Sequence, residues 1–185
     1  MFQIKYGNLI KEKSTFIVNA SNTELILGSG VSKAFRQHCG GSLFQQKLYD
    51  IKEQVGTINQ GDVILSDSGI ADNFKYALHV AVMNYSDDTK SPHPTYKQIQ
   101  KSLFNILKII EDKIIKEQIK SPKLVIPLLG CGTGGLKKEK VFFLIKNTFL
   151  KSKTDLEVIL YLHEKKDYLK FKIKALKNIT NQRSQ

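Results

Sequence analysis

The glycine-dense segment P-L-L-G-C-G-T-G-G-L, between positions 127 and 136, is the part of this chain best suited to chemistry. Glycine occupies four of its positions: Gly130, Gly132, Gly134 and Gly135. Residues without a Cβ let a ligand come close to the backbone. An apolar run over 124–126 precedes the segment and a helical pattern follows it, so consecutive N–H groups would point at one spot beside a helix N-terminus. We therefore predict a phosphate or pyrophosphate site, in preference to a tight turn that needs one or two glycines.

Two common phosphate-binding motifs do not account for this segment. A P-loop needs Lys and then Ser or Thr after its last glycine, whereas Leu136 follows here. The spacing Gly130-x-Gly132-x-x-Gly135 matches the dinucleotide-binding fingerprint, but it stands late in the chain. Only one further strand and helix can follow it, so the two halves of that sheet cannot both be built. A different nucleotide-binding fold is needed.

A second cluster supplies polar groups and another glycine loop. The apolar, β-branched run 15–18 leads into N-A-S-N at 19–22, and G-S-G-V follows at 28–31, before a helical stretch over 32–38. Asparagine side chains at the end of a strand offer donors and acceptors for sugar hydroxyls. The plainer interpretation is a strand, an Asx-turn and a helix N-cap, and this segment alone does not decide between the two.

Taken together, these segments resemble the macro domain family. The family's V-N-A-A-N and G-G-G-V appear here as V-N-A-S-N at 18–22 and G-S-G-V at 28–31. Three further matches follow the same order along the chain. G-N-L-I at 7–10 stands in place of the family's G-D-I, the segments 61–63 and 75–80 resemble its two middle strands, and 127–136 resembles its diphosphate loop. The resemblance covers roughly residues 1 to 178.

The resemblance implies a three-layer α/β/α macro domain with a mixed, mostly parallel six-stranded sheet. We expect a single domain over residues 1–178 and a C-terminal tail over 179–185, and a chain of 185 residues suits one such core. Strands are expected near 2–6, 15–20, 61–66, 76–83, 123–129 and 155–162. Helices are expected near 31–38, 42–54, 95–117, 137–151 and 164–178.

Composition excludes several classes of protein. Apolar residues make up 41% of the chain and charged residues 25%, as in ordinary globular proteins. No stretch approaches the roughly 18 apolar residues of a membrane span, and no secretory leader is recognisable, so we expect a cytoplasmic protein without a membrane partner. Both cysteines are then expected to be free thiols. No pair of the potential zinc ligands has C-x-x-C or H-x-x-x-H spacing, so we predict no metal site, and we expect no cofactor.

The net charge of +12 is concentrated near the C-terminus. From Lys137 onward there are 13 Lys and Arg against 5 Asp and Glu. One interpretation is a solvated amphipathic helix. The alternative is attraction of a polyanion, either poly(ADP-ribose) or nucleic acid, through this basic C-terminal region.

The ligand implied by the resemblance is ADP-ribose. The residues expected to bind it are Asn8, Leu9, Ala20, Asn22, Gly28, Gly30, Val31, Gly130, Cys131, Gly132, Thr133 and Gly134. By resemblance, Asn22 would hold the distal ribose, and Asn8 stands where the family's aspartate accepts a bond from the adenine amino group. Either Tyr161 or Leu162 is expected to pack on the base, and the sequence does not decide which.

Two residues, Asn22 and Ser32, are the candidates for catalysis. An aspartate often follows G-G-G-V in family members that remove ADP-ribose from proteins, and here Ser32 holds that position. A hydroxyl can orient a water but is no general base at neutral pH. Some family members that lack this acid are thought to work through the substrate's own phosphate, so the resemblance implies that activity here would rely on it. The other acid–base candidates are His38 and His79, and we expect His79 to be a core residue.

Three functions remain open. The first is a hydrolase of ADP-ribose derivatives such as mono-ADP-ribosyl protein, O-acyl-ADP-ribose or ADP-ribose 1''-phosphate. The second is a non-catalytic reader of ADP-ribose or poly(ADP-ribose), which Ser32 favours. The third is a basic module for a polymeric partner. Because the sequence shows no attached effector domain for a reader to recruit, we favour the hydrolase.

Overall fold

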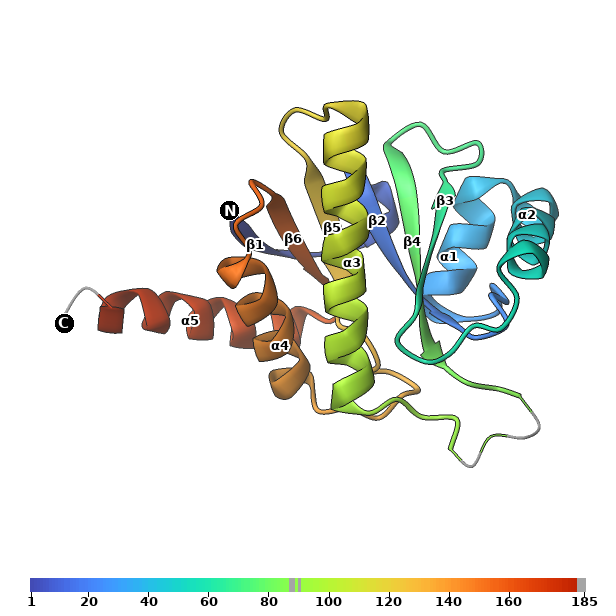
Figure 1. The fold of residues 1–185 in the computed structure, drawn as a ribbon. Coiled ribbons are helices and arrows are strands. Elements are labelled where there is room, and N and C mark those ends of the chain that lie inside the picture. Colours follow the sequence, from blue (N-terminus) through green and yellow to red (C-terminus); the bar gives the residue numbers. More distant parts are fainter. Residues whose placement is uncertain (87–88, 90, 183–185) are drawn as a thin grey trace.

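Strands and helices alternate along the chain in the computed structural model, which describes residues 1–86, 89 and 91–182 (Figure 1). The strands are β1 (Phe2–Tyr6), β2 (Ser14–Asn22), β3 (Val63–Asp67), β4 (Phe74–Met83), β5 (Lys123–Pro127) and β6 (Glu157–Leu162). The helices are a short 3₁₀ turn η1 (Leu9–Lys11) and α1 (Gly30–Cys39), α2 (Gly41–Val55), α3 (Tyr96–Glu117), α4 (Lys138–Lys151) and α5 (Lys165–Gln182).

The six strands form one sheet in the order β1-β6-β5-β2-β4-β3. All neighbouring pairs are parallel except the edge pair β3 and β4, which is antiparallel. Helical crossovers are what parallel strands require, and they cover both faces of the sheet. The predicted mixed, mostly parallel six-stranded sheet is confirmed.

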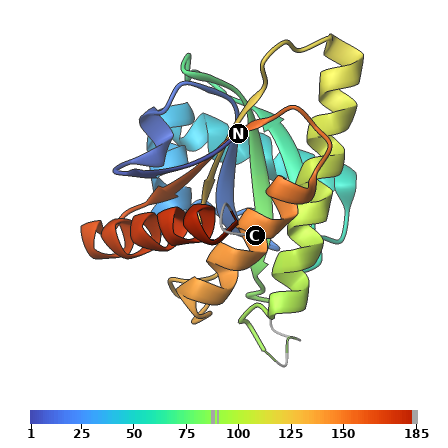
Figure 2. The ribbon, with the colours of Figure 1, turned by 90° about the vertical axis from the view of Figure 1, so that its left-hand side faces the viewer.

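Each face of the sheet has its own apolar core. Phe16 and Val18 of β2 pack in the core beneath α3 and α4, whereas Ile17 between them packs beneath α1 and α2. This alternation follows from the period of two residues along a strand. Seen from the side, the sheet lies between the two helical layers (Figure 2). Helix α5 packs at the β1 end, where the rings of Phe171 and Phe142 stack with centroids 4.6 Å apart.

Element boundaries lie within two residues of the expected ones, except at the end of α5. Strand β2 continues to Asn22, because its end still pairs with Met83 of β4. The turn η1 was not expected, and it forms where the side-chain oxygen of Asn8 accepts the N–H of Ile10 at 3.2 Å. Helix α5 continues to Gln182, past the expected boundary at 178, and residues 183–185 of the expected tail lie outside the described residues.

The carboxyl ends of β2, β4, β5 and β6 meet at one edge of the sheet, at the bottom in Figure 1. Loops leave this edge toward α1, α3, α4 and α5, and ligands of open α/β sheets bind at such an edge. Among the helices that the structure describes, none has the length and apolar composition that crossing a bilayer requires.

Candidate functional site

Two adjoining cavities of about 320 and 660 Å³ lie at the carboxyl edge of the sheet. The residues that line both are Gly30, Val31, Pro127, Leu128 and Gly132, so the cavities form one continuous groove, here called the strand-end cleft. Its smaller part lies over the ends of β2 and β4. Its larger part lies between η1 and the start of α5.

Every residue predicted to bind the ligand lines this cleft. The smaller part is lined by Ala20, Asn22, Gly28, Ser32, Gly130, Thr133 and Gly134, and the larger part by Asn8, Leu9 and Cys131. The remaining three, Gly30, Val31 and Gly132, line both parts. Tyr161 and Leu162 both border the larger part, so the structure leaves both next to the expected base position. Folding thus brings together segments more than 100 positions apart in the sequence.

The loop after β5 presents a row of unused backbone donors. The N–H groups of residues 131–134 have no hydrogen-bond acceptor in the part of the chain that the structure describes. The loop is closed by two bonds, from Leu136 N–H to the Gly130 carbonyl at 2.9 Å and from Gly135 N–H to the Gly132 carbonyl at 3.0 Å. Gly130 and Gly135 both have φ near +70°, which L side chains rarely adopt. Such a loop is a nest for an anion.

A side chain would have different surroundings at two glycines of this loop. A Cβ at Gly132 would meet no heavy atom within 4 Å, so its side faces open space. A Cβ at Gly134 would lie 2.6 Å from the carbonyl oxygen of Gly130. Gly134 is therefore required for packing within the loop, and not, as we had reasoned from the sequence, to keep space free for the ligand.

The N-terminus of α1 faces the same cleft. Its N-cap residue Ser29 makes no side-chain capping bond, and Gly30 has φ of +53°. The N–H groups of residues 28–32 donate to no acceptor among the described residues, whereas the next one, of Lys33, donates to the Ser29 carbonyl. Unsatisfied N–H groups and the helix dipole together favour a negative group at this position.

The side chain of Asn22 is largely used within its own loop. Its Oδ1 accepts the N–H groups of Glu24 and Ile26, both at 3.1 Å, and its Nδ2 donates to the Ile26 carbonyl at 2.9 Å. Both lone pairs of Oδ1 are thus engaged, and a single N–H remains for a ligand. Asn22 can donate to a sugar hydroxyl but has no free acceptor for one.

Tyr161, which borders the larger part of the cleft, belongs to a hydrogen-bond network around Glu12. Its carboxylate accepts bonds from the hydroxyl of Tyr161 and from the Lys5 ammonium, the latter at 2.9 Å. Burial alone would raise the pKa of Glu12, but these two bonds lower it overall. Burial, and then the bond to Glu12, raises the pKa of Tyr161. Tyr161 is therefore held in a fixed orientation as a neutral phenol.

Ser32 lies beneath the floor of the smaller part, with 4% of its surface exposed. Its Oγ is 3.0 Å from Oδ1 of Asn19 and 2.9 Å from the carbonyl oxygen of Ala20. Among the described residues, no Asp or Glu lines this part of the cleft. In the larger part, Glu164 and Asp167 are paired with Lys138 at 2.9 and 2.6 Å.

The other acid–base candidates lie outside the smaller part of the cleft. His79 is fully buried, and burial lowers its pKa to about 3. His38 lines neither part of the cleft; its Nε2 is 2.7 Å from the Asn73 side-chain oxygen and its ring stacks on Phe74. Burial raises the pKa of the Cys131 thiol to about 12, so the thiol is uncharged at neutral pH.

Sequence reasoning missed Tyr85 and Lys138 as cleft residues. Tyr85 lines the smaller part, is 53% exposed and stands two positions after β4 ends. An aromatic residue just beyond a strand's carboxyl end was the available signal. Lys138 opens α4 and reaches the larger part, where its pKa is raised first by its bond to Asp167 and then by Glu164. Its partners come from the next segment of the chain, so the sequence held no comparable signal.

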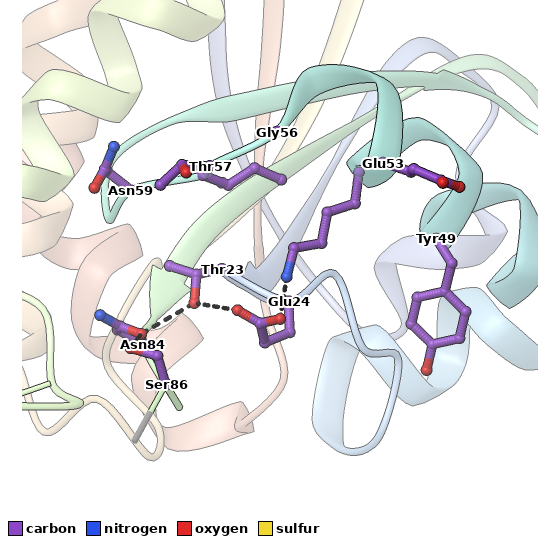
Figure 3. Close-up of a pocket in the computed structure, with 11 residues that line it drawn as sticks. Thr23, Glu24, Tyr49, Glu53, Gly56, Thr57, Asn59, Asn84 and Ser86 are labelled. Atoms are coloured by element: carbon purple, nitrogen blue, oxygen red, sulfur yellow. Dashed lines mark hydrogen bonds and ion pairs between the residues drawn. The ribbon is translucent and has the colours of Figure 1, made fainter. Parts of the chain in front are cut away.

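A separate polar pocket of about 650 Å³ adjoins the smaller part (Figure 3). It shares no lining residue with the strand-end cleft as the described chain forms them. The hydroxyl of Thr23 donates to the Asn84 side-chain oxygen at 3.1 Å, and Lys52 forms an ion pair with Glu24 across the pocket. Thr23 and Asn84 directly follow Asn22 and Met83, so this bonded pair separates the pocket from the cleft.

A model of a known protein family covers most of the chain. The Macro domain family model matches residues 18–145. A protein of Pyrococcus abyssi is 27% identical over 179 residues, which cover 91% of this chain and 93% of that protein. A macro domain-containing protein of Caldanaerobacter subterraneus subsp. tengcongensis is 24% identical over 167 residues, 88% of each chain.

Solved structures share the same fold. A glycine-to-valine variant of the Oceanobacillus iheyensis macrodomain with ADPR has a TM-score of 0.76 at 19% identity, over 96% of this chain and 92% of that one. The Trypanosoma brucei macrodomain in complex with ADP-ribose has a TM-score of 0.72 at 16% identity, over 95% of this chain and 68% of that one.

The two loop glycines generate a stability prediction. Gly134→Val is expected to lower the free energy of unfolding by about 1–3 kcal/mol, because its Cβ overpacks the Gly130 backbone. Gly132→Val, the matched control in the same loop, is expected to change it by less than about 0.5 kcal/mol. Urea denaturation of both variants measures this difference. Equal destabilisation would show that the loop packs differently.

Proposed function

Because the chain belongs to the macro domain family, we propose that it binds ADP-ribose in the strand-end cleft and hydrolyses ADP-ribose derivatives there. The observation that carries the proposal is the pair of donor rows, residues 28–32 and 131–134, which border one cleft from opposite sides. A diphosphate between them would receive backbone N–H bonds from both loops and would lie at the N-terminus of α1. The chain's overall excess of positive charge adds to this attraction.

With the diphosphate between the loops, the two ends of the ligand fall in the two parts of the cleft. The adenosine end takes the larger part, beside Asn8, Tyr161 and Leu162. The distal ribose takes the smaller part, where Asn22 has one N–H free to donate to a hydroxyl. The proposed positions of both ends agree with the placement that the family's motifs imply.

Recognition of adenine is expected to be weaker than with a carboxylate. The Oδ1 of Asn8 caps η1 and keeps one lone pair for the adenine amino group. A neutral amide oxygen replaces the charged acceptor of the family's usual aspartate, and charge-assisted bonds are roughly twice as strong. The ligand is therefore held mainly by its diphosphate.

Hydrolysis would depend on the substrate for its base. Ser32 is the polar residue beneath the distal end of the cleft, and its oxygen can orient a water. A serine hydroxyl does not take a proton at neutral pH. In the proposed reaction the water oxygen bonds to the carbon that carries the leaving group, and the bond from that carbon to the leaving group breaks, with its electron pair going to the leaving group. The proton that the water loses passes to an oxygen of the substrate's own diphosphate.

The second candidate is a non-catalytic reader of ADP-ribose or poly(ADP-ribose). The absence of a carboxylate among the described residues of the smaller part favours it. A reader needs only the donor loops, which are complete without an acid. Calorimetry with ADP-ribose tests what both candidates share, and a turnover assay on mono-ADP-ribosylated protein separates them.

The binding prediction concerns Gly132. ADP-ribose is expected to bind with micromolar Kd, or about −8 kcal/mol. Gly132→Val places a branched side chain in the open space of the cleft and is expected to weaken binding about tenfold or more, with the fold intact. Isothermal titration calorimetry measures both. Absence of heat with millimolar ADP-ribose would contradict the proposed site, as would normal binding by the folded variant.

A second prediction concerns the missing carboxylate. Ser32→Asp is expected to raise hydrolysis of mono-ADP-ribosylated protein, because position 32 lies in the first turn of α1, where a negative charge is stabilised. General-base catalysis is worth about 10²–10⁴-fold, and a grafted acid without supporting groups should gain far less. Single-turnover rates measure the gain. Ser32→Ala is the control and is expected to cost little; loss of all turnover in it would show that the hydroxyl is essential.

A third prediction separates ADP-ribose from polyanions. Lys165, Lys166, Lys170 and Lys172 of α5 do not line the cleft, so replacing all four by glutamine should leave the Kd for ADP-ribose nearly unchanged. Charges farther away than about 8 Å are largely screened at physiological salt. The matched control neutralises four lysines of α3: Lys97, Lys101, Lys108 and Lys116.

If the basic C-terminal region binds poly(ADP-ribose) or nucleic acid, only the α5 variant should lose affinity for it and part of its salt dependence. Titrations at several salt concentrations decide this. Equal losses in both variants would indicate attraction by net charge alone, and loss of ADP-ribose binding would show that these lysines, like Asp167 of the same helix, contribute to the cleft.

A further inference from the structure

A buried chain of hydrogen bonds connects the edge strand β3 to the floor of the cleft. It passes from Ser66 on β3 to His79 on β4, then to Asn19 on β2 and to Ser32 on α1. The successive distances are 2.9 Å from Ser66 Oγ to His79 Nε2, 3.0 Å from His79 Nδ1 to Asn19 Nδ2, and 3.0 Å from Asn19 Oδ1 to Ser32 Oγ. None of the four is more than 5% exposed.

The direction of every bond in this chain is determined by its ends. The hydroxyl of Ser66 donates to the Asp67 carbonyl at 2.8 Å, so its oxygen accepts from His79. Burial keeps His79 neutral, with one N–H, which must then be at Nε2. Its Nδ1 consequently accepts from the Asn19 amide.

At the cleft end, the single proton of Ser32 is used inside the protein. Its two neighbours, Oδ1 of Asn19 and the carbonyl of Ala20, are both acceptors. A hydroxyl has one proton and two lone pairs, so the oxygen of Ser32 can present only lone pairs to the cleft. Two acceptors on the inner side thus leave no donor for a ligand.

We propose that Asn19 and His79 are positioning residues that hold Ser32 as an acceptor, and not a donor, toward the group bound in the cleft. That group must then offer a proton, as a water or a ribose hydroxyl does; its identity rests on the proposed function. These hydrogen bonds therefore make Ser32 an acceptor toward the cleft, as a carboxylate would be, but without a negative charge.

The same series of hydrogen bonds can also form with every donor and acceptor reversed. A carboxylate at position 32 would require a donor, so the Asn19 amide would turn its Nδ2 toward it and its Oδ1 toward His79. The proton of His79 would then move from Nε2 to Nδ1, and Ser66 would donate to Nε2 in place of the Asp67 carbonyl. No proton is gained or lost, and the tautomer of His79 reports which group occupies position 32.

The test is the tautomer of His79, read from the two ring nitrogens in two-bond ¹H–¹⁵N spectra of the histidine-labelled protein. In the wild type the proton is expected on Nε2. In Ser32→Asp, whose carboxylate requires a donor, the protonated and unprotonated nitrogens are expected to exchange identities. Ser32→Ala, which removes the hydroxyl and adds no acceptor, is expected to keep the wild-type tautomer.

His38 provides the internal reference. The amide nitrogen of Asn73 donates to the Ile10 and Glu12 carbonyls, so the Asn73 side-chain oxygen faces His38 and accepts from its Nε2. The ring proton of neutral His38 is therefore expected on Nε2 in every variant. A wild-type His79 protonated on Nδ1 would overturn the proposal, and so would an unchanged tautomer in folded Ser32→Asp. The wild-type spectrum needs no substitution, so it decides even if that variant folds poorly. The spectra need neither ADP-ribose nor turnover, so failure of the proposed function would be seen separately, in calorimetry.

Discussion

The parallel pairing of β2 with both β4 and β5 is the constraint on which the cleft depends. Parallel neighbours place their carboxyl ends at the same edge, so the loop after β2 and the loop after β5 must lie side by side. Between β2 and the first turn of α1, the N–H groups of residues 28–32 are unpaired within the described chain, and in the loop after β5 those of residues 131–134 are unpaired. Unpaired backbone donors are costly when buried, and at an open cleft they are available to water or to an anion.

Side chains at the cleft mainly support the backbone and leave little for direct contact with a ligand. Asn22 spends most of its hydrogen-bonding capacity on residues 24–26, and Asn8 caps η1. Gly134 is needed for contact with Gly130. The residues that carry the family's motif therefore form the loops first and contact the ligand with what remains, which explains why small residues dominate the site.

The buried polar chain beneath Ser32 contrasts with the apolar cores on either side. Buried polar groups are tolerated when each has a partner, and here each of the four side chains has one on each side. Because its members come from three strands and a helix, a change at position 32 that reverses these bonds reaches β3 through hydrogen bonds rather than through packing. Ser32 is thus part of the sheet's interior as much as of the cleft.

The sequence by itself determined the strand and helix positions within a few residues and, through its resemblance to the macro domain family, the fold class and many of the residues that line the cleft. The element positions follow from local patterns, namely apolar periodicity, glycine in turns and asparagine at a strand's end, whereas the fold class and the ligand residues follow from the resemblance. It could not show that His79 and Asn19 join Ser32, that Lys138 pairs with Asp167, or that Gly134 packs on Gly130. Those contacts join residues whose side chains meet only when the sheet is assembled, because strand order and helix packing, and not local spacing, decide which groups face one another.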